Sequence, residues 1–397
     1  MPKPARTAFV LFLLALAVRI ALGAWTGISG PPVEDERGYT LLAASVADGR
    51  GFELPVPDSH APPRTSFRAP LVPLLYAPLA SLGGGVREFR MLSILIGALG
   101  APLLYLASRR SALGERAAWA GAAYALWPPA VYESVRALAE PPSQALLLGA
   151  LALLAAPPVW AAAGGGALAA LAVLARPSAL LPAALVLFAA GSRRRGAAFV
   201  LAFVLVLAPW ALRNWELHSR PLLTTNSGVT LVGGNCDAAL AAEYPGKWAP
   251  PQRVYAGRED PPDLGMWGWS ALSEEASDRR FSADAVHWVC EDPFRAVRLG
   301  FWKLVRLVDP DPRSEKGDAG AKSIAGWLTL APVLLLACIG ARRGERVWWV
   351  LLAGTALTAL VFYGDTRMRT CADPALLVLA VHGAMRVTRS LRGRGVD

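Results

Sequence analysis

Charged side chains are scarce in this sequence. Only 18% of its 397 residues are Asp, Glu, Lys or Arg, whereas a typical soluble protein has about 25%. Lysine is particularly rare, so arginine carries nearly all of the excess positive charge, which is +10. The four histidines are scattered, and the four cysteines form no CxxC pair. These shortages exclude an ordinary soluble domain and give no sign of a structural metal site.

Apolar residues are abundant instead, at 54%, and they recur in long runs from end to end. A helix that crosses a bilayer needs about 20 mostly apolar residues, with roughly 17 as the lower limit. Several runs are rich in Ala and Gly, which lets helices pack closely in lipid. The pattern predicts an all-α polytopic membrane protein with about ten transmembrane helices, near residues 8–25, 88–108, 115–133, 139–156, 159–175, 177–192, 196–213, 322–341, 346–363 and 372–388.

The basic residues indicate the orientation of these helices. With ten spans, the basic clusters before the first span, in three of the connections and after the last span all fall on one side. By the positive-inside rule that side is the cytoplasm, so we expect a plasma (inner) membrane protein with both termini cytoplasmic. The positive charge then reflects orientation and contact with membrane lipids rather than nucleic-acid binding. The clusters are Lys3 and Arg6; Arg109, Arg110 and Arg116; Arg193, Arg194 and Arg195; Arg342, Arg343 and Arg346; and Arg386, Arg389, Arg392 and Arg394.

This topology leaves two loops on the outer side, at about residues 26–87 and 214–322. We therefore divide the chain into a transmembrane catalytic module with its outer loop (1–213), an outer loop region (214–321) and C-terminal helices with a cytoplasmic tail (322–397). Cys236 and Cys290 both lie in the second outer loop. Disulfides persist on the outer side of a cell, so these two cysteines could pair or remain free.

The first outer loop carries an unusual acidic triplet, Glu34-Asp35-Glu36. It stands just before a short amphipathic run that begins at Tyr39, which is too short to span and is expected to lie along the interface. A second short apolar run follows Arg68. The triplet is either a solvated loop or a functional group held at the membrane surface. Arg68 is either a lipid-headgroup anchor or a ligand for the phosphate of a lipid-linked substrate.

The first outer loop resembles that of GT-C glycosyltransferases. The similar positions are Asp35-x-x-x-Tyr39, Gly49-x-Gly51-Phe52 and Arg68-x-Pro70-x-x-Pro73. The nearest branch is the bacterial one related to dolichyl-phosphate-mannose–protein mannosyltransferases and to the lipid A aminoarabinose transferase. The resemblance continues at Ala139-Glu140, Arg176-Pro177-Ser178, Pro209-Trp210-x-x-Arg213-Asn214, Thr225-Asn226-Ser227-Gly228, an amphipathic helix from Glu274 through Pro293 to Lys303, and Gly364-Asp365-x-Arg367-x-Arg369. In the last of these Met368 replaces the usual tyrosine, and the proline expected after the second arginine is absent.

The resemblance implies transfer of a sugar from a polyprenyl-phosphate donor to an acceptor on the outer face, with inversion. An acceptor hydroxyl needs a base as it attacks, and one carboxylate suffices. The position similar to the family's base is Asp35, and Glu36 is the alternative. Glu140 either stabilises the N-terminus of the helix that it opens or orients the acceptor. A divalent cation shared by Asp35 and Glu140 remains open. The departing phosphate needs positive charge, for which the candidates are Arg68, Lys303, Arg367 and Arg369.

Three further residues are also site candidates, and two of them have an ordinary structural explanation. Tyr39 belongs to the motif of the first loop, Arg213 follows a span and could simply reach the interface, and Asn226 stands beside a glycine and could serve a turn. The acceptor could be a lipid, a glycan or a protein hydroxyl. Two other classes remain open. A transporter or flippase would place charges in mid-membrane or show duplicated halves, and an inactive relative would not depend on Asp35.

Overall fold

The structure is a computed structural model that describes residues 3–33, 35–54, 64–241, 245–256, 273–309, 319–341 and 346–393. Within these ranges every regular element is a helix. The one pairing of extended chain that occurs there is an isolated bridge between Glu53 and Arg64. The prediction of an all-α protein is confirmed.

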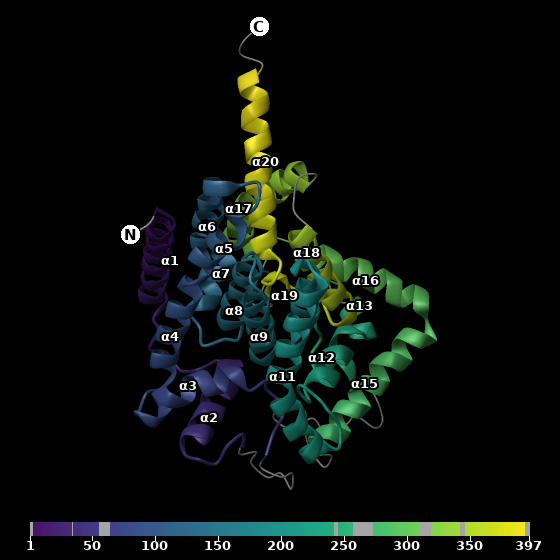
Figure 1. The fold of residues 1–397 in the computed structure, drawn as a ribbon. Coiled ribbons are helices and arrows are strands. Elements are labelled where there is room, and N and C mark those ends of the chain that lie inside the picture. Colours follow the sequence, from purple (N-terminus) through teal and green to yellow (C-terminus); the bar gives the residue numbers. More distant parts are fainter. Residues whose placement is uncertain are drawn as a thin grey trace.

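In the described ranges, twenty α-helices follow one another, with short 3-10 turns at Gly114–Arg116, Pro177–Ala179 and Val186–Ala189. Figure 1 shows their arrangement. The helices are α1 Lys3–Thr26, α2 Asp35–Ala47, α3 Leu71–Ser81, α4 Val86–Ala98, α5 Gly100–Ser108, α6 Ala117–Ala125, α7 Pro128–Ser134, α8 Glu140–Leu154, α9 Val159–Ala175, α10 Leu180–Leu185, α11 Arg193–His218, α12 Ser227–Gly234, α13 Asp237–Ala241, α14 Pro251–Val254, α15 Glu274–Glu291, α16 Pro293–Val308, α17 Ala319–Gly340, α18 Arg346–Val361, α19 Thr366–Arg369 and α20 Asp373–Gly393.

Each of the ten segments predicted to span the membrane contains helix. Among the residues that the structure describes, three helical stretches are long and apolar enough to cross a bilayer, namely Lys3–Thr26, Val86–Ser108 and Arg193–His218. Others are apolar but shorter, such as Val159–Ala175, and the sixth segment is divided between α10 and 3-10 turns. The three candidates for membrane-spanning helices lie between residues 3 and 218. The total of ten spans stays a prediction.

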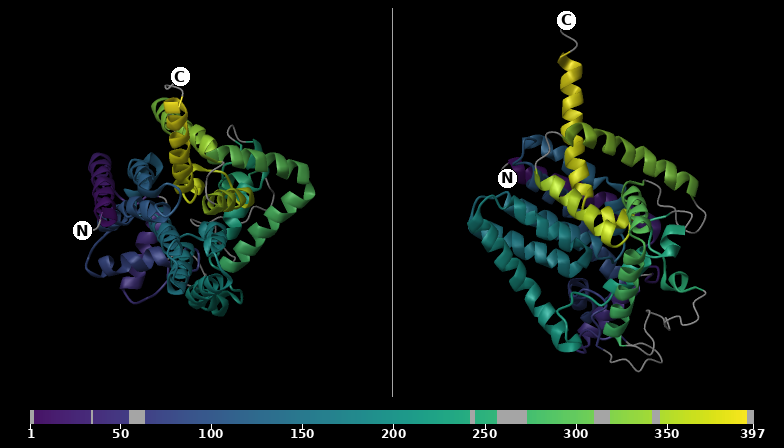
Figure 2. Two further views of the ribbon diagram at one scale, coloured as in Figure 1. Left: turned by 45° about the horizontal axis from the view of Figure 1, so that its top comes forward. Right: turned by 90° about the vertical axis from the view of Figure 1, so that its right-hand side faces the viewer.

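The helices of the bundle approach one another closely at glycines. A Cβ on Gly166 of α9 would lie 2.1 Å from the carbonyl oxygen of Phe199 on α11. A Cβ on Gly383 of α20 would lie 1.9 Å from the carbonyl oxygen of Leu336 on α17. Figure 2 shows α9 and α11 running side by side and α20 extending beyond the bundle toward the C-terminus. Small residues therefore set these helix contacts, as is usual where lipid gives no hydrophobic drive to association.

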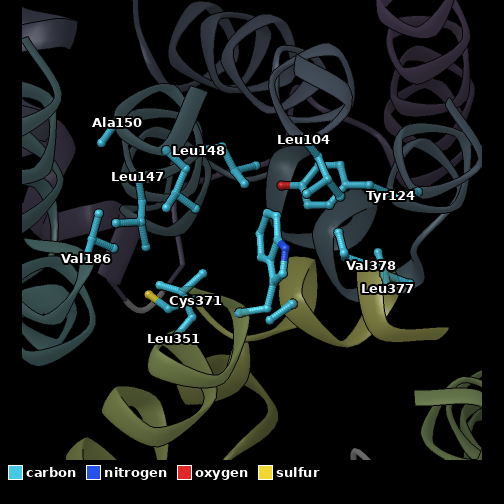
Figure 3. Close-up of a cluster of buried hydrophobic side chains, with 14 of the residues drawn as sticks. Leu104, Tyr124, Leu147, Leu148, Ala150, Val186, Leu351, Cys371, Leu377 and Val378 are labelled. Atoms are coloured by element: carbon cyan, nitrogen blue, oxygen red, sulfur yellow. The ribbon is translucent and has the colours of Figure 1, made fainter. Parts of the chain in front are cut away.

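The core of the bundle is an apolar cluster between the two halves of the chain. Leu104, Tyr124 and Leu148 from the first half meet Leu351 and Leu377 from the second (Figure 3). At one side of this cluster, the Tyr124 hydroxyl donates to Oε1 of Gln144 at 2.6 Å, and Nε2 of Gln144 donates to the Thr370 carbonyl at 2.7 Å. This chain of bonds attaches the end of α19 to the core and so fixes the turn that carries Arg367.

In the region predicted to be the second outer loop, the described residues form helices α12 to α16, which pack on one another. The predicted amphipathic helix from Glu274 to Lys303 is two helices, α15 and α16. They separate at Asp292, whose side chain accepts from the Arg295 backbone at 3.0 Å. Pro293 disfavours helical geometry at the residue before it, but fits the first turn of a new helix.

The two cysteines of this loop do not pair. Cys236 is buried, where its Sγ contacts the Gly233 carbonyl at 3.7 Å, and Cys290 is exposed on α15. Both are free thiols. Of the two states that the sequence left open, the structure shows the free one. Two cysteines on the same loop need not face each other, because the packing of the loop sets the direction of their side chains.

Candidate active site

A cavity of about 270 Å³ opens among α2, the start of α8, the turn after α9, α12 and α19. Six of the ten residues singled out from the sequence line it. They come from both ends of the chain and are Asp35, Tyr39, Arg68, Glu140, Asn226 and Arg367. In Figure 1, α2 and α3 lie at the end of the molecule opposite the C-terminus, and α8, α9, α12 and α19 lie above them in this view.

Asp35 is the first residue of α2, and both of its oxygens are held by arginines. Oδ1 accepts from Nη2 of Arg68 at 2.7 Å, and Oδ2 accepts from Nη2 of Arg367 at 2.9 Å. The charge of Arg68, and after it that of Arg367, outweighs burial and keeps the pKa of Asp35 well below its usual range. The carboxyl is therefore ionised throughout the working pH range, but in this arrangement it is a weak base.

Glu140 begins α8 and is the second carboxylate of the cavity. Two prolines follow it at the first positions of the helix, where a missing N–H costs nothing. Its Oε1 accepts from Nε of Arg367 at 2.9 Å and lies 3.4 Å from Nη2 of Arg176. Its Oε2 is buried without a hydrogen-bond partner among the described residues. One oxygen is thus committed to arginine, and the other is available to a ligand that donates a hydrogen bond.

Arg68 faces Asp35 from the segment just before α3. Its guanidinium lies over the rings of Tyr39 and Phe67, at 5.4 and 5.2 Å from their centroids. Burial would lower the pKa of Arg68, but the charge of Asp35 raises it. Its Nε is buried and makes no hydrogen bond with the described part of the chain. Arg68 therefore has an unused donor beside the cavity.

The loop that carries Arg68 is fixed by contacts with the second outer loop. Glu274 is buried, and its carboxylate accepts from the Thr65 hydroxyl at 2.9 Å, from the Ser66 backbone at 3.1 Å and from the Thr225 hydroxyl. Arg213 donates to the Ser66 hydroxyl at 2.6 Å. Arg213 thus lies outside the cavity lining and supports the segment that leads to Arg68.

Arg367 connects the two carboxylates. Asp365 caps the short helix α19 by accepting from the Arg367 backbone at 3.0 Å, which sets the direction of the side chain. The guanidinium then bonds Asp35 at 2.9 Å and Glu140 at 2.9 Å. The charge of Glu140, followed by that of Asp35, raises the pKa of Arg367 far above its usual value. Arg367 is permanently charged at the centre of the cavity.

Arg176 is a charged cavity residue that the sequence did not single out as a site. It ends α9, where its Nη1 donates to the Arg367 carbonyl at 2.8 Å and to the Thr370 hydroxyl at 3.1 Å. Its Nη2 lies 3.8 Å from the sulfur of Met368, the residue that departs from the family's pattern. Its signal was the Arg-Pro pair at an outer helix end, which also fits a membrane anchor.

Four predicted site residues do not line the cavity. Arg213, described above, is the first of them. Glu36 is the second and is completely buried. Its Oε1 and Oε2 accept from Arg90 at 2.9 and 2.6 Å, and Oε1 also accepts from the Ala137 backbone at 2.8 Å. Arg369 is paired with Asp373 at 2.6 Å. Glu36 and Arg369 are thus engaged in buried ion pairs away from the cavity. Glu34 lies outside the described residues.

Lys303 is the fourth, and it is buried behind one wall of the cavity. Its Nζ donates to Oδ1 of Asn235 at 2.7 Å and to the Leu360 carbonyl at 3.0 Å. Both acceptors are neutral, and burial lowers the pKa of Lys303 to about 7. Lys303 therefore connects α12, α16 and the end of α18 rather than meeting Asp35.

The two cavity carboxylates do not suit a shared divalent cation in this arrangement. The guanidinium of Arg367 lies between them and supplies the positive charge that such an ion would bring. Hard cations such as Mg²⁺ and Ca²⁺ take six or more oxygen ligands, many of them carboxylate. Among the described residues no group of three His, Cys, Asp or Glu side chains is placed to hold a metal.

Comparison with known proteins gives a distant similarity of fold. No protein-family model matches the sequence, and no curated protein matches it. Among solved structures, the chain is similar to the crystal structure of ArnT from Cupriavidus metallidurans bound to undecaprenyl phosphate. The TM-score is 0.44 and the identity 14%, over 99% of this chain and 78% of that one. A likeness of this degree says nothing about the substrate or the reaction of this protein.

Proposed function

We propose that this protein is a membrane glycosyltransferase that moves a sugar from a polyprenyl-phosphate donor to an acceptor hydroxyl at the outer face. The observation that carries the proposal is the cavity itself, where carboxylates, guanidinium groups and an apolar wall meet in one space. Sugar transfer from a lipid phosphate requires these three features. It needs a base for the acceptor, positive charge for the leaving group and a path for the lipid.

The balance of charge supports a donor with a single phosphate. Three guanidinium groups line the cavity, from Arg68, Arg176 and Arg367, against the two carboxylates of Asp35 and Glu140. The surplus of one positive charge matches a sugar phosphodiester, which carries one negative charge. A diphosphate would bring a second negative charge that this cavity leaves uncompensated, and an uncompensated charge in a partly buried site is costly.

The apolar part of the cavity supports a lipid tail. Pro177, Leu180, Leu181, Val361 and Phe362 form this part of the lining. Leu180 and Leu181 are each 37% exposed on α10, so the apolar wall continues to the surface of the molecule. A polyprenyl chain that follows this wall reaches lipid without crossing the charged residues, while its phosphate stays beside the arginines.

The proposed reaction is a single displacement. The acceptor oxygen forms a bond to the anomeric carbon while the bond from that carbon to the phosphate oxygen breaks, which inverts the centre. The acceptor proton passes to the carboxylate of Asp35. The lipid phosphate leaves with the electrons of the broken bond, so its negative charge increases. Arg68 and Arg367 stabilise that charge, because arginine donates two parallel hydrogen bonds to phosphate.

Donor binding would also activate the base. In the structure Arg68 and Arg367 bond Asp35, so the donor phosphate competes with the carboxylate for the same donors. When phosphate takes those hydrogen bonds, Asp35 loses the interactions that depress its pKa. The mechanism therefore requires the donor to bind before the acceptor proton is transferred.

The proposal is tested by the release of polyprenyl phosphate, a product that does not depend on the acceptor's identity. The purified protein would be reconstituted with polyprenyl-phosphoryl sugars and a membrane extract, and the lipids followed by mass spectrometry. We expect free lipid phosphate and a glycosylated product from wild type but not from Asp35→Asn. Movement of intact donor across the vesicle without its cleavage would instead indicate a flippase.

The outward orientation of the cavity has a separate test that uses a native thiol. Cys290 is exposed on α15, in the region that we place outside the membrane. A membrane-impermeant maleimide should label Cys290 in intact cells, whereas Arg194→Cys, in a Cys290→Ser and Cys338→Ser background, should react only after the membrane is opened. The reverse pattern would place the cavity on the inner side.

A further inference from the structure

We propose that the polar wall of the cavity, defined as Thr224, Asn226, Ser227 and Thr230, binds the sugar of the donor and selects an uncharged one. This inference rests on the proposed function and adds to it the class of sugar. All four residues line the same cavity as Asp35 and Arg367. They belong to the start of α12 and the segment before it, on the second outer loop.

The polar wall lies next to the proposed phosphate site. The Thr225 backbone N–H donates to the Ser66 carbonyl at 3.1 Å, which brings Asn226 alongside the segment that ends at Arg68. A sugar phosphodiester places its ring directly beside its phosphate. A phosphate bound at Arg68 therefore leaves the sugar within reach of Asn226 and its neighbours.

The groups of the polar wall retain hydrogen-bonding capacity. Asn226 caps no helix N–H, and its Oδ1 accepts one long bond, at 3.3 Å from the Thr230 hydroxyl. Within the part of the chain that the structure describes, the Ser227 hydroxyl makes only long contacts with Thr224, at 3.4 and 3.5 Å. Sugar hydroxyls can donate and accept, as can these amide and hydroxyl groups. The wall therefore suits a ring that carries hydroxyl groups.

No charge is available on this wall. None of its four residues ionises in the working pH range, and Asp278 already occupies the N-terminal end of α12, where its Oδ1 accepts from the Gly228 backbone at 2.6 Å. The end of the helix is thereby closed to an acidic sugar, which would otherwise be favoured there. An acidic or a cationic substituent would be desolvated here without a partner of opposite charge.

The free oxygen of Glu140 does not alter this conclusion. Oε2 has no partner, but the same carboxylate is bound by Arg367 and lies near Arg176. Those two cations repel an ammonium group that approaches Glu140, whereas a neutral hydroxyl can donate to Oε2 without that repulsion. Glu140 thus adds one acceptor to a site built for hydroxyl groups.

The test compares three polyprenyl-phosphoryl donors of the same chain length, bearing a neutral hexose, an amino sugar and a hexuronate. Release of lipid phosphate is measured for each. We expect kcat/KM to be higher for the neutral donor by about 10-fold or more, since an uncompensated charge in the site costs at least as much as one lost hydrogen bond. Preference for a charged donor overturns the inference but leaves the glycosyltransferase intact. Release from none of the donors overturns the proposed function.

Asn226→Asp provides the matched variant, because it keeps the shape of the side chain and adds a negative charge. It should lower kcat/KM for the neutral donor about 10-fold and raise the relative use of the amino-sugar donor. Gln252→Glu adds the same charge at an exposed position of α14, outside the cavity lining, and should leave the selectivity unchanged. An unchanged ratio of neutral to amino-sugar donor in a folded Asn226→Asp variant, judged by its melting temperature, would remove Asn226 from the sugar site.

Discussion

Asp35 and Glu36 are neighbours on the first turn of α2, yet they lie in two different regions of the molecule. Glu36 is completely buried and is bound by Arg90 and by the Ala137 backbone. The side chain of Asp35 is 28% exposed in the cavity. Its two arginine partners, Arg68 and Arg367, line the same cavity, so a ligand that enters it can compete for them. The comparison teaches that a saturated carboxylate fixes structure, whereas one held by exchangeable partners is placed for chemistry.

The largest contrast is expected from Asp35→Asn. It should lower turnover by about 100-fold or more, because the proton of the acceptor loses its base. The melting temperature should stay close to that of wild type, since the residue is at the cavity and its amide can still accept from arginine. Lipid phosphate release and thermal unfolding in detergent measure the two effects.

Donor binding supplies the control for this variant. Asn competes less well than a carboxylate for Arg68 and Arg367, so Asp35→Asn should bind polyprenyl phosphate at least as tightly as wild type. A titration with the lipid followed by thermal shift would detect this. Turnover near the wild-type value would rule out Asp35 as the base, and a large loss of lipid affinity would contradict the competition between carboxylate and phosphate.

Glu36→Gln should show the opposite behaviour. Removal of one partner from a buried ion pair leaves the charge of Arg90 uncompensated and costs about 3–5 kcal/mol. We therefore expect a marked drop in melting temperature, with the activity of the folded fraction near that of wild type at low temperature. A stable but inactive Glu36→Gln protein would transfer the role of base from Asp35 to Glu36.

The arginines of the cavity should act mainly on the donor. Arg367→Gln should raise the KM for the lipid-phosphate donor about 10- to 100-fold, because a hydrogen bond to a charged group contributes about 1.5–3 kcal/mol. Arg50→Gln, an exposed change whose ion pair with Asp48 lies outside the cavity lining, is the matched control. If both KM for the donor and kcat were unchanged in Arg367→Gln, the phosphate would bind elsewhere.

The effect with the least bearing on the cavity concerns Lys303 and the pH dependence of stability. Its pKa is about 7 in the folded protein and 10.5 ordinarily, so between these values the unfolded chain holds a proton that the folded chain has released. Stability should then rise with pH over this range, by at most about 1.4 kcal/mol per pH unit. Lys303→Met should flatten the rise in melting temperature between pH 7 and 10, and Lys3→Met should not. Parallel curves for wild type and Lys303→Met would show that Lys303 stays protonated.

Much of the fold could be predicted from local sequence. The helices at 35–47 and 71–81 follow from a short apolar pattern, and the Arg-rich connections indicate a topology. The sequence analysis expected one helix over 274–303, but its division at Pro293 could have been predicted, since proline restricts the residue before it. The free state of Cys236 and Cys290 was not, because side-chain direction depends on packing against elements that the local sequence does not specify.

The candidate site divides in the same way. Asp35, Arg68, Glu140 and Arg367 could be proposed from their places at outer helix ends. The Arg-Pro pair at Arg176 also stood out in the sequence, but it fits a membrane anchor equally well. Lys303 and Arg369 were as suitable as Arg367 for binding the donor phosphate. Which of these arginines and lysines share a space with Asp35 depends on contacts such as that of Arg367, 332 residues away along the chain.

The sequence by itself determined that this protein is helical and apolar, with acidic and basic residues grouped at predicted helix ends, because periodicity and composition act locally. Only the tertiary structure decided which of two adjacent carboxylates meets the cavity. Successive residues on a helix point about 100° apart, so packing of α2 against Arg90 and Ala137 turned Glu36 inward and left Asp35 between Arg68 and Arg367.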